Sequence, residues 1–304
     1  MRGLSPTFIQ NLKENYGLSA LLQYVKYDNT LDIEIRENKI NIYYRGGSAL
    51  RITEVAPNKY GFHFDKNYFL SDSSLLYDSI PILNSETDWK QYFPLVKQGM
   101  DFYITKRPKE EREFQQLVVR ENNYSNISNA TDYYIIDIEY DNHKNARFDM
   151  VALEWESSGS KRKLPKSYKP KLSIIEMKYG DGALKGSAGM VKHINDFKQF
   201  LSNSIEVQDF KTEMITIFQQ KRELGLIPCL SKDRNPNEVT EVHLDIEFVF
   251  LIANHDPASS ILRSEMQKLP IDIKFSASNF AGFGLFKENV YTHHQFLEKF
   301  QNQI

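Results

Sequence analysis

The chain has 304 residues, of which 41% are hydrophobic and 13% aromatic, and its formal net charge at pH 7 is -2. This length and composition suffice for one large domain or two modest ones with a buried core. No apolar run reaches the roughly 18 residues of a membrane-spanning helix, and the first residues lack the apolar segment of a signal peptide. We therefore expect a soluble protein without a membrane partner. Its single cysteine, Cys229, fits a cytoplasmic location.

The first hundred residues predict a helix followed by a small antiparallel sheet. The helix covers about residues 6–24, and four short segments with alternating apolar and polar residues follow it, namely LDIEIR, KINIYYRG, SALRITEV and KYGFHF. Turn-forming pairs separate these segments: Glu37-Asn38, Gly46-Gly47 and Pro57-Asn58. Because tight turns join antiparallel neighbours, we expect residues 1–104 to form a separate helix and β-meander unit that selects a substrate or a partner.

Residues 105–304 predict a mixed α/β domain, an α+β mixed sheet flanked by helices. The segment 85–103 predicts a helix kinked at Pro94, and Thr105 with Pro108 predicts the beginning of the next helix. From residue 108 onward the order is helix, three strands, helix, helix, strand, and a short later strand is expected at 282–286. The run FVFLIA is apolar on both faces, which indicates a strand in the middle of a covered sheet.

Two charges stand in the apolar strand KLSIIEMK, at Glu176 and Lys178. Residues two apart share a face of a strand, so both side chains point the same way. The neighbouring strand ARFDMVALE carries Asp149, which strand pairing could bring beside Glu176. Two adjacent carboxylates repel each other unless a cation lies between them, and Mg²⁺ is typically held by one or two carboxylates. The alternative is a structural ion pair with a spare carboxylate.

These residues resemble the motif of the PD-(D/E)XK nuclease superfamily, which has the restriction-endonuclease-like fold. Phe148-Asp149 stands where the family has Pro-Asp, and Glu176-Met177-Lys178 matches the E-x-K element, with the similarity covering about residues 108–255. The resemblance implies that Asp149, Glu176 and the Met177 carbonyl bind Mg²⁺, with Mn²⁺ as a substitute. It also implies that Lys178 is the catalytic lysine.

The helix segment EREFQQLV resembles the first helix of this superfamily, notably in archaeal Holliday-junction resolvases, where an early glutamate joins the metal site. The resemblance points to Glu111 as a further catalytic residue. Glu110, which lies nearer the apolar face, and Glu113 remain alternatives.

Basic residues gather in the segment KRKLPKSYKPK, between the strands that carry Asp149 and Glu176. Such a segment could hold a phosphate backbone, although many charged segments are only solvated loops. The candidate nucleic-acid-binding residues are Lys161, Arg162, Lys163, Lys166 and Lys169 in this segment, and Lys192 on the following helix. His193 is an alternative to Lys192 as a substrate contact.

Two functions are therefore expected from the sequence. The first is a metal-dependent nuclease that hydrolyses phosphodiester bonds, with DNA as the favoured partner and a role in defence or in a mobile element. The second is a catalytically silent module of the same fold that binds nucleic acid or a partner protein. A homodimer is left open by both.

Overall fold

The computed structural model describes residues 2–69, 77–124, 130–142, 146–156, 169–227, 238–254, 259–278, 285 and 290–301. The chain divides into two compact units. Unit 1 comprises residues 1–116 and 219–226, and unit 2 comprises residues 117–218 and 227–304. The boundary predicted between residues 104 and 105 precedes this division, which falls inside helix α5 (Glu110–Asn123).

Unit 1 begins with two helices where the sequence predicted one. Helix α1 (Pro6–Glu14) begins after Ser5, whose hydroxyl accepts a hydrogen bond from the backbone N–H of Phe8 at 3.0 Å. Asn15 has an extended backbone, ends α1, and caps α2 (Tyr16–Tyr27) by accepting hydrogen bonds from two backbone N–H groups. The prediction of one continuous helix was wrong because the apolar spacing continues across this cap, while the backbone does not.

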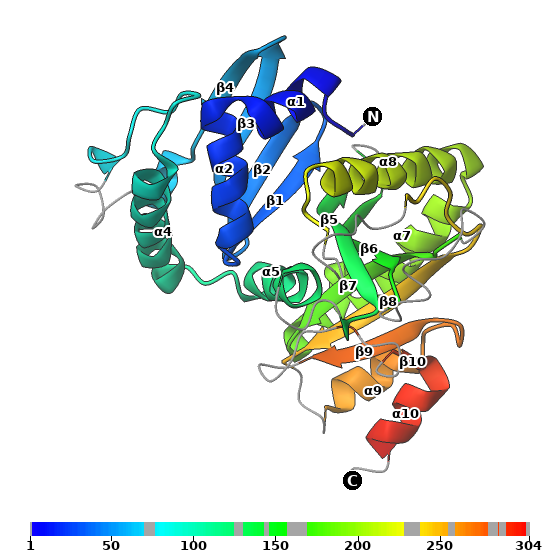
Figure 1. Ribbon diagram of the computed structural model, residues 1–304. Coiled ribbons are helices and arrows are strands. Elements are labelled where there is room, and N and C mark those ends of the chain that lie inside the picture. The colour runs from blue at the N-terminus through cyan, green and yellow to red at the C-terminus, as the bar shows by residue number, and fades with distance from the viewer. Residues whose placement is uncertain are drawn as a thin grey trace. The chain divides into compact units, whose positions relative to one another are not determined.

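The predicted β-meander is present in unit 1 as an antiparallel sheet, in the order β1-β2-β3-β4 among the described residues (Figure 1). Its strands are β1 (Leu31–Arg36), β2 (Lys39–Tyr44), β3 (Gly47–Ala56) and β4 (Lys59–His63). Arg45 and Gly46 make the turn between β2 and β3, with φ values of 49° and 71°. Two residues with positive φ match the twist of the strands that they join. The turn is therefore Arg45-Gly46, and Gly47 already belongs to β3.

All six residues of strand β1 are buried, the polar ones included, although apolar and polar residues alternate along its sequence. The alternation in LDIEIR predicts a solvated polar face, yet Glu34 is 0% exposed. Nζ of Lys221, from the 219–226 segment of unit 1, lies 3.1 Å from Oε1 of Glu34, and both side chains are fully buried. A residue far away in the sequence thus covers the polar face of β1.

Helix α4 (Trp89–Lys106) completes most of the core of unit 1. Asp88 caps its beginning, Pro94 lies inside it, and Trp89 and Phe93 are buried aromatic residues on its inner face. The short 3₁₀ helix η1 (Lys66–Phe69) packs on it. Thr105 donates its hydroxyl to the Asp101 carbonyl at 2.7 Å within α4. The prediction that Thr105 caps the next helix was therefore wrong.

Unit 2 contains a mixed sheet, in the order β10-β9-β8-β7-β6-β5 among the described residues (Figure 1). The strands are β5 (Tyr133–Asp141), β6 (Arg147–Glu154), β7 (Leu172–Tyr179), β8 (Ile246–Ala253), β9 (Lys274–Ser278) and β10 (Tyr291–Thr292). β5, β6 and β7 are antiparallel, while β7, β8 and β9 are parallel. The predicted mixed sheet and the inner position of β8 are confirmed. Of the short strand expected at 282–286, only Leu285 lies within the described residues.

Helices pack against this sheet through aromatic side chains. The helices that follow α5 are α7 (Met190–Leu201), α8 (Ser204–Glu223), α9 (Ser260–Met266) and α10 (His293–Gln301), and the glycine-rich turn before α7 contains the 3₁₀ helices η3 (Asp181–Ala183) and η4 (Gly186–Ala188). Phe197 of α7 lies 4.8 Å, between ring centroids, from Phe248 of β8, and Phe218 of α8 lies 5.7 Å from Tyr134 of β5. The predicted order of elements from residue 108 onward is confirmed. In the described part of the chain, no helix has both the length and the apolarity needed to cross a membrane.

Candidate active site

The candidate active site lies on β7, where the E-x-K motif stands. β6 and β7 pair antiparallel up to the pair of Met150 and Ile175. One further step in this register places Asp149 opposite Glu176, and residues directly opposite each other project to the same face. The backbone of Met177 donates instead to the Asp149 side chain, with 2.8 Å between N and Oδ2. The Asp149 carboxylate therefore lies beside the peptide that joins Glu176 to Met177.

Glu176 and Lys178 form a buried ion pair within one strand. Nζ of Lys178 lies 2.9 Å from Oε1 of Glu176, and the two side chains are 4% and 3% exposed. The parallel strand β8 places Phe250 beside Glu176 and Ile252 beside Lys178. Taking either charge out of water is costly unless a close partner compensates, so each of these charges depends on the other.

His193, in the first turn of α7, joins the same cluster. Its Nδ1–H donates to Oε1 of Glu176 at 3.0 Å, and its side chain is 22% exposed. Burial raises the pKa of Glu176, but the hydrogen bond from His193 and the charge of Lys178 outweigh it and hold this pKa below its usual value. His193 is the most exposed member of the cluster, whereas Glu176 and Lys178 are both buried.

Sequence reasoning assigned the contact from this helix to Lys192 and kept His193 as the alternative. Lys192 is exposed and pairs with Asp196, one turn further along α7. His193 lies three residues after Met190 and four before Phe197, which are both buried. This spacing places His193 on the inward stripe of the helix, and it is the signal that would have favoured His193 over Lys192.

The candidate glutamates of α5 lie in its first turn, within unit 1. Nε and Nη2 of Arg45 donate to the two carboxylate oxygens of Glu113 at 2.7 and 3.1 Å, so Glu113 has a structural partner. Glu110 is exposed and Glu111 is half-buried. The part of Glu111 in the site stays a prediction.

Most of the basic segment lies outside the residues that the structure describes. Lys161, Arg162, Lys163 and Lys166 lie outside the described residues. Lys169 is described and exposed, and it pairs with Glu241. The predicted nucleic-acid contacts of this segment therefore stay predictions.

Glu139 of β5 is a residue that the sequence reasoning did not consider. The register on both sides of it places Glu139 opposite Asp149 of β6. Its backbone has a φ of 50°, an uncommon conformation for a residue other than glycine and one that clusters at functional sites. The position of Glu139 opposite Asp149 depends on the register between β5 and β6, which the sequence of the hairpin does not specify.

Among the described residues, no group of three or more His, Cys, Asp or Glu side chains could hold a metal ion. Asp149 and Glu176 form a smaller donor set. Oε1 of Glu176 accepts hydrogen bonds from Lys178 and His193, whereas Oε2 accepts none from the described residues. Two carboxylates fit Mg²⁺, which takes water and phosphate oxygens as its remaining ligands.

Models of protein families, curated protein sequences and solved structures were each compared with the chain, and none matches it. The resemblance to PD-(D/E)XK nucleases therefore rests on the motif residues and on the order of the elements that carry them.

Proposed function

We propose that unit 2 is a metal-dependent nuclease that hydrolyses phosphodiester bonds in nucleic acid, with DNA as its substrate. The observation that carries this proposal is the cluster of Glu176, Lys178 and His193. Beside it, the carboxylate of Asp149 accepts a hydrogen bond from the backbone of β7. Buried charged groups that converge on one partly accessible point, as at Glu176, are more frequent at active sites than elsewhere. In addition, Phe148-Asp149 and Glu176-Met177-Lys178 resemble the motif of the PD-(D/E)XK nucleases.

Asp149, Glu176 and the Met177 carbonyl would hold Mg²⁺, which when bound lowers the pKa of a water ligand and neutralises phosphate charge. Lys178 carries its proton at Nζ and offsets negative charge that develops on the phosphate. Because it shares the Glu176 oxygen with His193, its ammonium group has a fixed position before any substrate arrives. Electrostatic stabilisation of a transition state depends on such preorganised groups.

His193 has two roles in the proposed site. Its Nδ1–H orients the Glu176 carboxylate. A neutral ring with its proton on Nδ1 has a hydrogen-bond acceptor at Nε2, and Nε2 forms no hydrogen bond with the described residues. This nitrogen can therefore orient a water molecule or contact the substrate.

Cleavage assays test the proposal. The full chain is incubated with duplex, single-stranded and branched DNA and with RNA, each with Mg²⁺, with Mn²⁺ and with a chelator. Asp149→Asn and Glu176→Gln should each lower the cleavage rate by about 100-fold or more, the usual effect of removing one preorganised group. Asp196→Asn, which changes a half-buried carboxylate on α7 that is paired with the exposed Lys192, is the matched control and should cleave at the rate of the wild type.

Calorimetric titration of Mg²⁺ provides a readout that does not depend on turnover. The wild type should bind the ion, and Asp149→Asn should bind it more weakly. Cleavage that persists in the chelator, or that is equal in all variants, would contradict the proposed site.

A catalytically silent module is the second candidate. It is favoured by the saturation of Oε1 of Glu176 with two donors, and by the described residues offering no three-residue metal group. This candidate predicts binding of nucleic acid without cleavage under every metal condition, and equal affinity in wild type and Asp149→Asn.

A further inference from the structure

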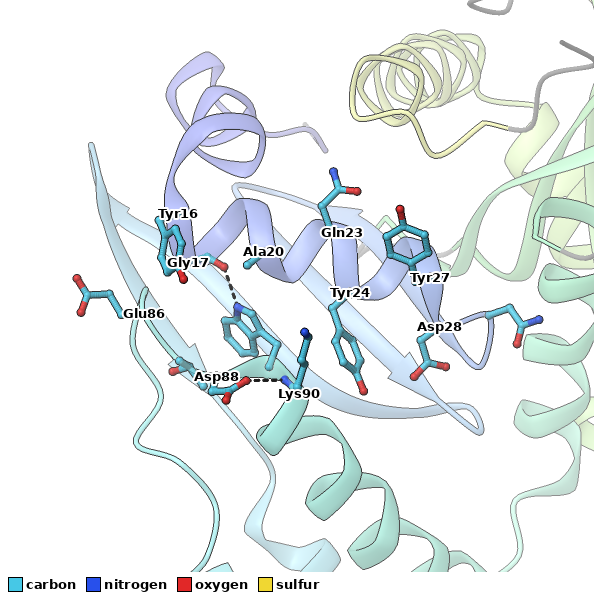
Figure 2. Close-up of a pocket in the computed structure, with 13 residues that line it drawn as sticks. Tyr16, Gly17, Ala20, Gln23, Tyr24, Tyr27, Asp28, Glu86, Asp88 and Lys90 are labelled. Atoms are coloured by element: carbon cyan, nitrogen blue, oxygen red, sulfur yellow. Dashed lines mark hydrogen bonds between the residues drawn. The ribbon is translucent and has the colours of Figure 1, made fainter. Parts of the chain in front are cut away.

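Unit 1 contains a groove between α2 and the segment that leads into α4 (Figure 2). Its volume is about 1050 Å³. Gly17 and Ala20 are among its lining residues on α2, and Trp89 supports it from the beginning of α4 by donating its indole N–H to the Gly17 carbonyl at 2.7 Å. Ala20 is small and exposed, so a side chain of a partner can approach α2 closely at this residue, whereas Gly17 is buried against the Ser85 carbonyl.

Aromatic side chains of α2 line the groove. Tyr16 and Tyr27 are 84% and 88% exposed, and Tyr24 stacks on Phe93 with 5.0 Å between the ring centroids. The other face of α2 is buried in the core of unit 1 through four aliphatic residues, Leu18, Leu21, Leu22 and Val25. Helix α2 therefore presents a second face that is rich in tyrosine. Exposed tyrosines are enriched at the energetic centres of protein interfaces.

The exposed face has the spacing of a helix-length docking surface. Tyr16, Ala20, Gln23 and Tyr27 recur at helical intervals, and all four are exposed. Tyr16 and Tyr27 are separated along the axis by about 16 Å, since an α-helix rises 1.5 Å per residue. Figure 2 shows these two rings at opposite ends of the groove, with Ala20 between them. A partner helix of about three turns has the same length.

The charges of the groove select the class of partner. Its lining includes the carboxylates of Asp28, Glu86 and Asp88, and Lys90 is its cation among the described lining residues. Asp28 is paired with Lys97, whereas Glu86 and Asp88 are exposed. The described rim thus has two exposed carboxylates against one exposed lysine, and this net negative charge repels the phosphates of a nucleic acid and attracts a cationic chain. Lysine and arginine also bind over tyrosine rings.

We propose that this tyrosine groove binds a segment of a partner protein that is rich in lysine and arginine. The proposal is independent of the nuclease function, because it depends on residues of unit 1 alone. The exposed tyrosines supply contact area, and Glu86 and Asp88 supply the charge that a basic segment complements.

The test measures binding of a fluorescently labelled amphipathic helical peptide, which has lysines on one face and leucines on the other. A second peptide, in which every lysine is replaced by glutamate, serves as the comparison. The full chain should bind the basic peptide at least tenfold more tightly than the acidic one. Tyr16→Ala, Tyr27→Ala and Glu86→Lys should each weaken binding by about fivefold or more, the effect expected of an interface residue that contributes measurably. Circular dichroism checks that each variant is folded.

Matched controls lie outside the groove. Tyr77→Ala removes another exposed tyrosine, and Glu14→Lys reverses another exposed carboxylate, so both should leave the affinity unchanged. Equal affinity for the two peptides, or losses in the controls as large as in the groove variants, would overturn the proposal. Concentration-dependent self-association that Tyr27→Ala abolishes would also overturn it, in favour of a second copy of the chain. Oligonucleotide binding that Tyr16→Ala abolishes would replace it with a nucleic-acid site.

Discussion

Replacement of Lys178 by methionine tests how much the buried ion pair of Glu176 and Lys178 contributes to the free energy of unfolding. The variant keeps most of the side-chain volume but leaves the buried Glu176 carboxylate with His193 as its remaining partner. Breaking a buried ion pair by removing one member costs about 3 to 5 kcal/mol. Because His193 still donates a hydrogen bond, we expect the lower end, about 3 kcal/mol. In a domain of about 150 to 250 residues, this loss lowers Tm by at least about 6 °C.

The free energy of unfolding is measured by urea titration at pH 7, and Tm is measured by calorimetry. The double variant Glu176→Leu with Lys178→Met should regain stability to within about 1 kcal/mol of the wild type, since apolar residues of similar volume replace a buried pair at little cost. Lys192→Met is the control, because an exposed pair one helical turn apart contributes less than about 0.5 kcal/mol. A loss below about 1 kcal/mol in Lys178→Met, or a double variant as unstable as the single one, would refute the reasoning.

Three further outcomes are expected. Because the pKa of Glu176 is lower in the folded state than its usual value of 4.5, this residue stabilises the fold at pH values above 4.5. The contribution is lost as pH falls through the folded-state pKa, so stability should depend less on pH in this range in Glu176→Gln than in the wild type. Burial, followed by the charge of Asp101, raises the pKa of Tyr44 to about 12 from 10.0. Its contribution to stability is present below pH 10 and lost as pH rises through 12, and the tyrosinate absorbance of wild type minus Tyr44→Phe should show a midpoint near 12. A Cβ at Gly17 would lie 0.9 Å from the Ser85 carbonyl oxygen, so Gly17→Ala should lower the free energy of unfolding by about 1 to 3 kcal/mol or more, whereas Gly182→Ala, with open space around it, should change it little.

The strands were predictable because their signals are local. Alternation marked the four strands of unit 1, and residues with positive φ, such as Asn38 and Asn58, lie in the turns that the sequence marked. The helix boundaries were less predictable. Asn15 and Thr105 are both residue types that form caps, yet Asn15 caps a helix and Thr105 returns its hydroxyl to its own helix. Residue type alone does not distinguish these two uses.

The candidate site was predictable to the extent that it depends on one strand. The two-residue period of a strand predicted that Glu176 and Lys178 share a face, and their side chains meet. The hydrogen bond from the Met177 backbone to Asp149 was not predictable, because it depends on where the ladder between β6 and β7 ends. The contact of His193 depends on the rotation of α7 over the sheet, for which the buried stripe of that helix was the available signal.

Burial alone does not distinguish a structural charge pair from a functional one. The chain contains two buried charge pairs that differ in how close they lie to solvent-accessible residues. Glu34 and Lys221 are both 0% exposed, so neither can meet a molecule from solvent, and their pairing joins segments of unit 1 that are distant in sequence. The pair of Glu176 and Lys178 is nearly as buried, but its oxygen is shared with His193, whose side chain is 22% exposed, and the half-buried Asp149 lies beside it. A substrate must reach the charges that act on it, so partial access next to buried charge is what a reaction requires and what a purely structural pair avoids. That difference in access, more than the E-x-K spacing itself, is the physical reason to propose chemistry at β7 and a structural role for the pair on β1.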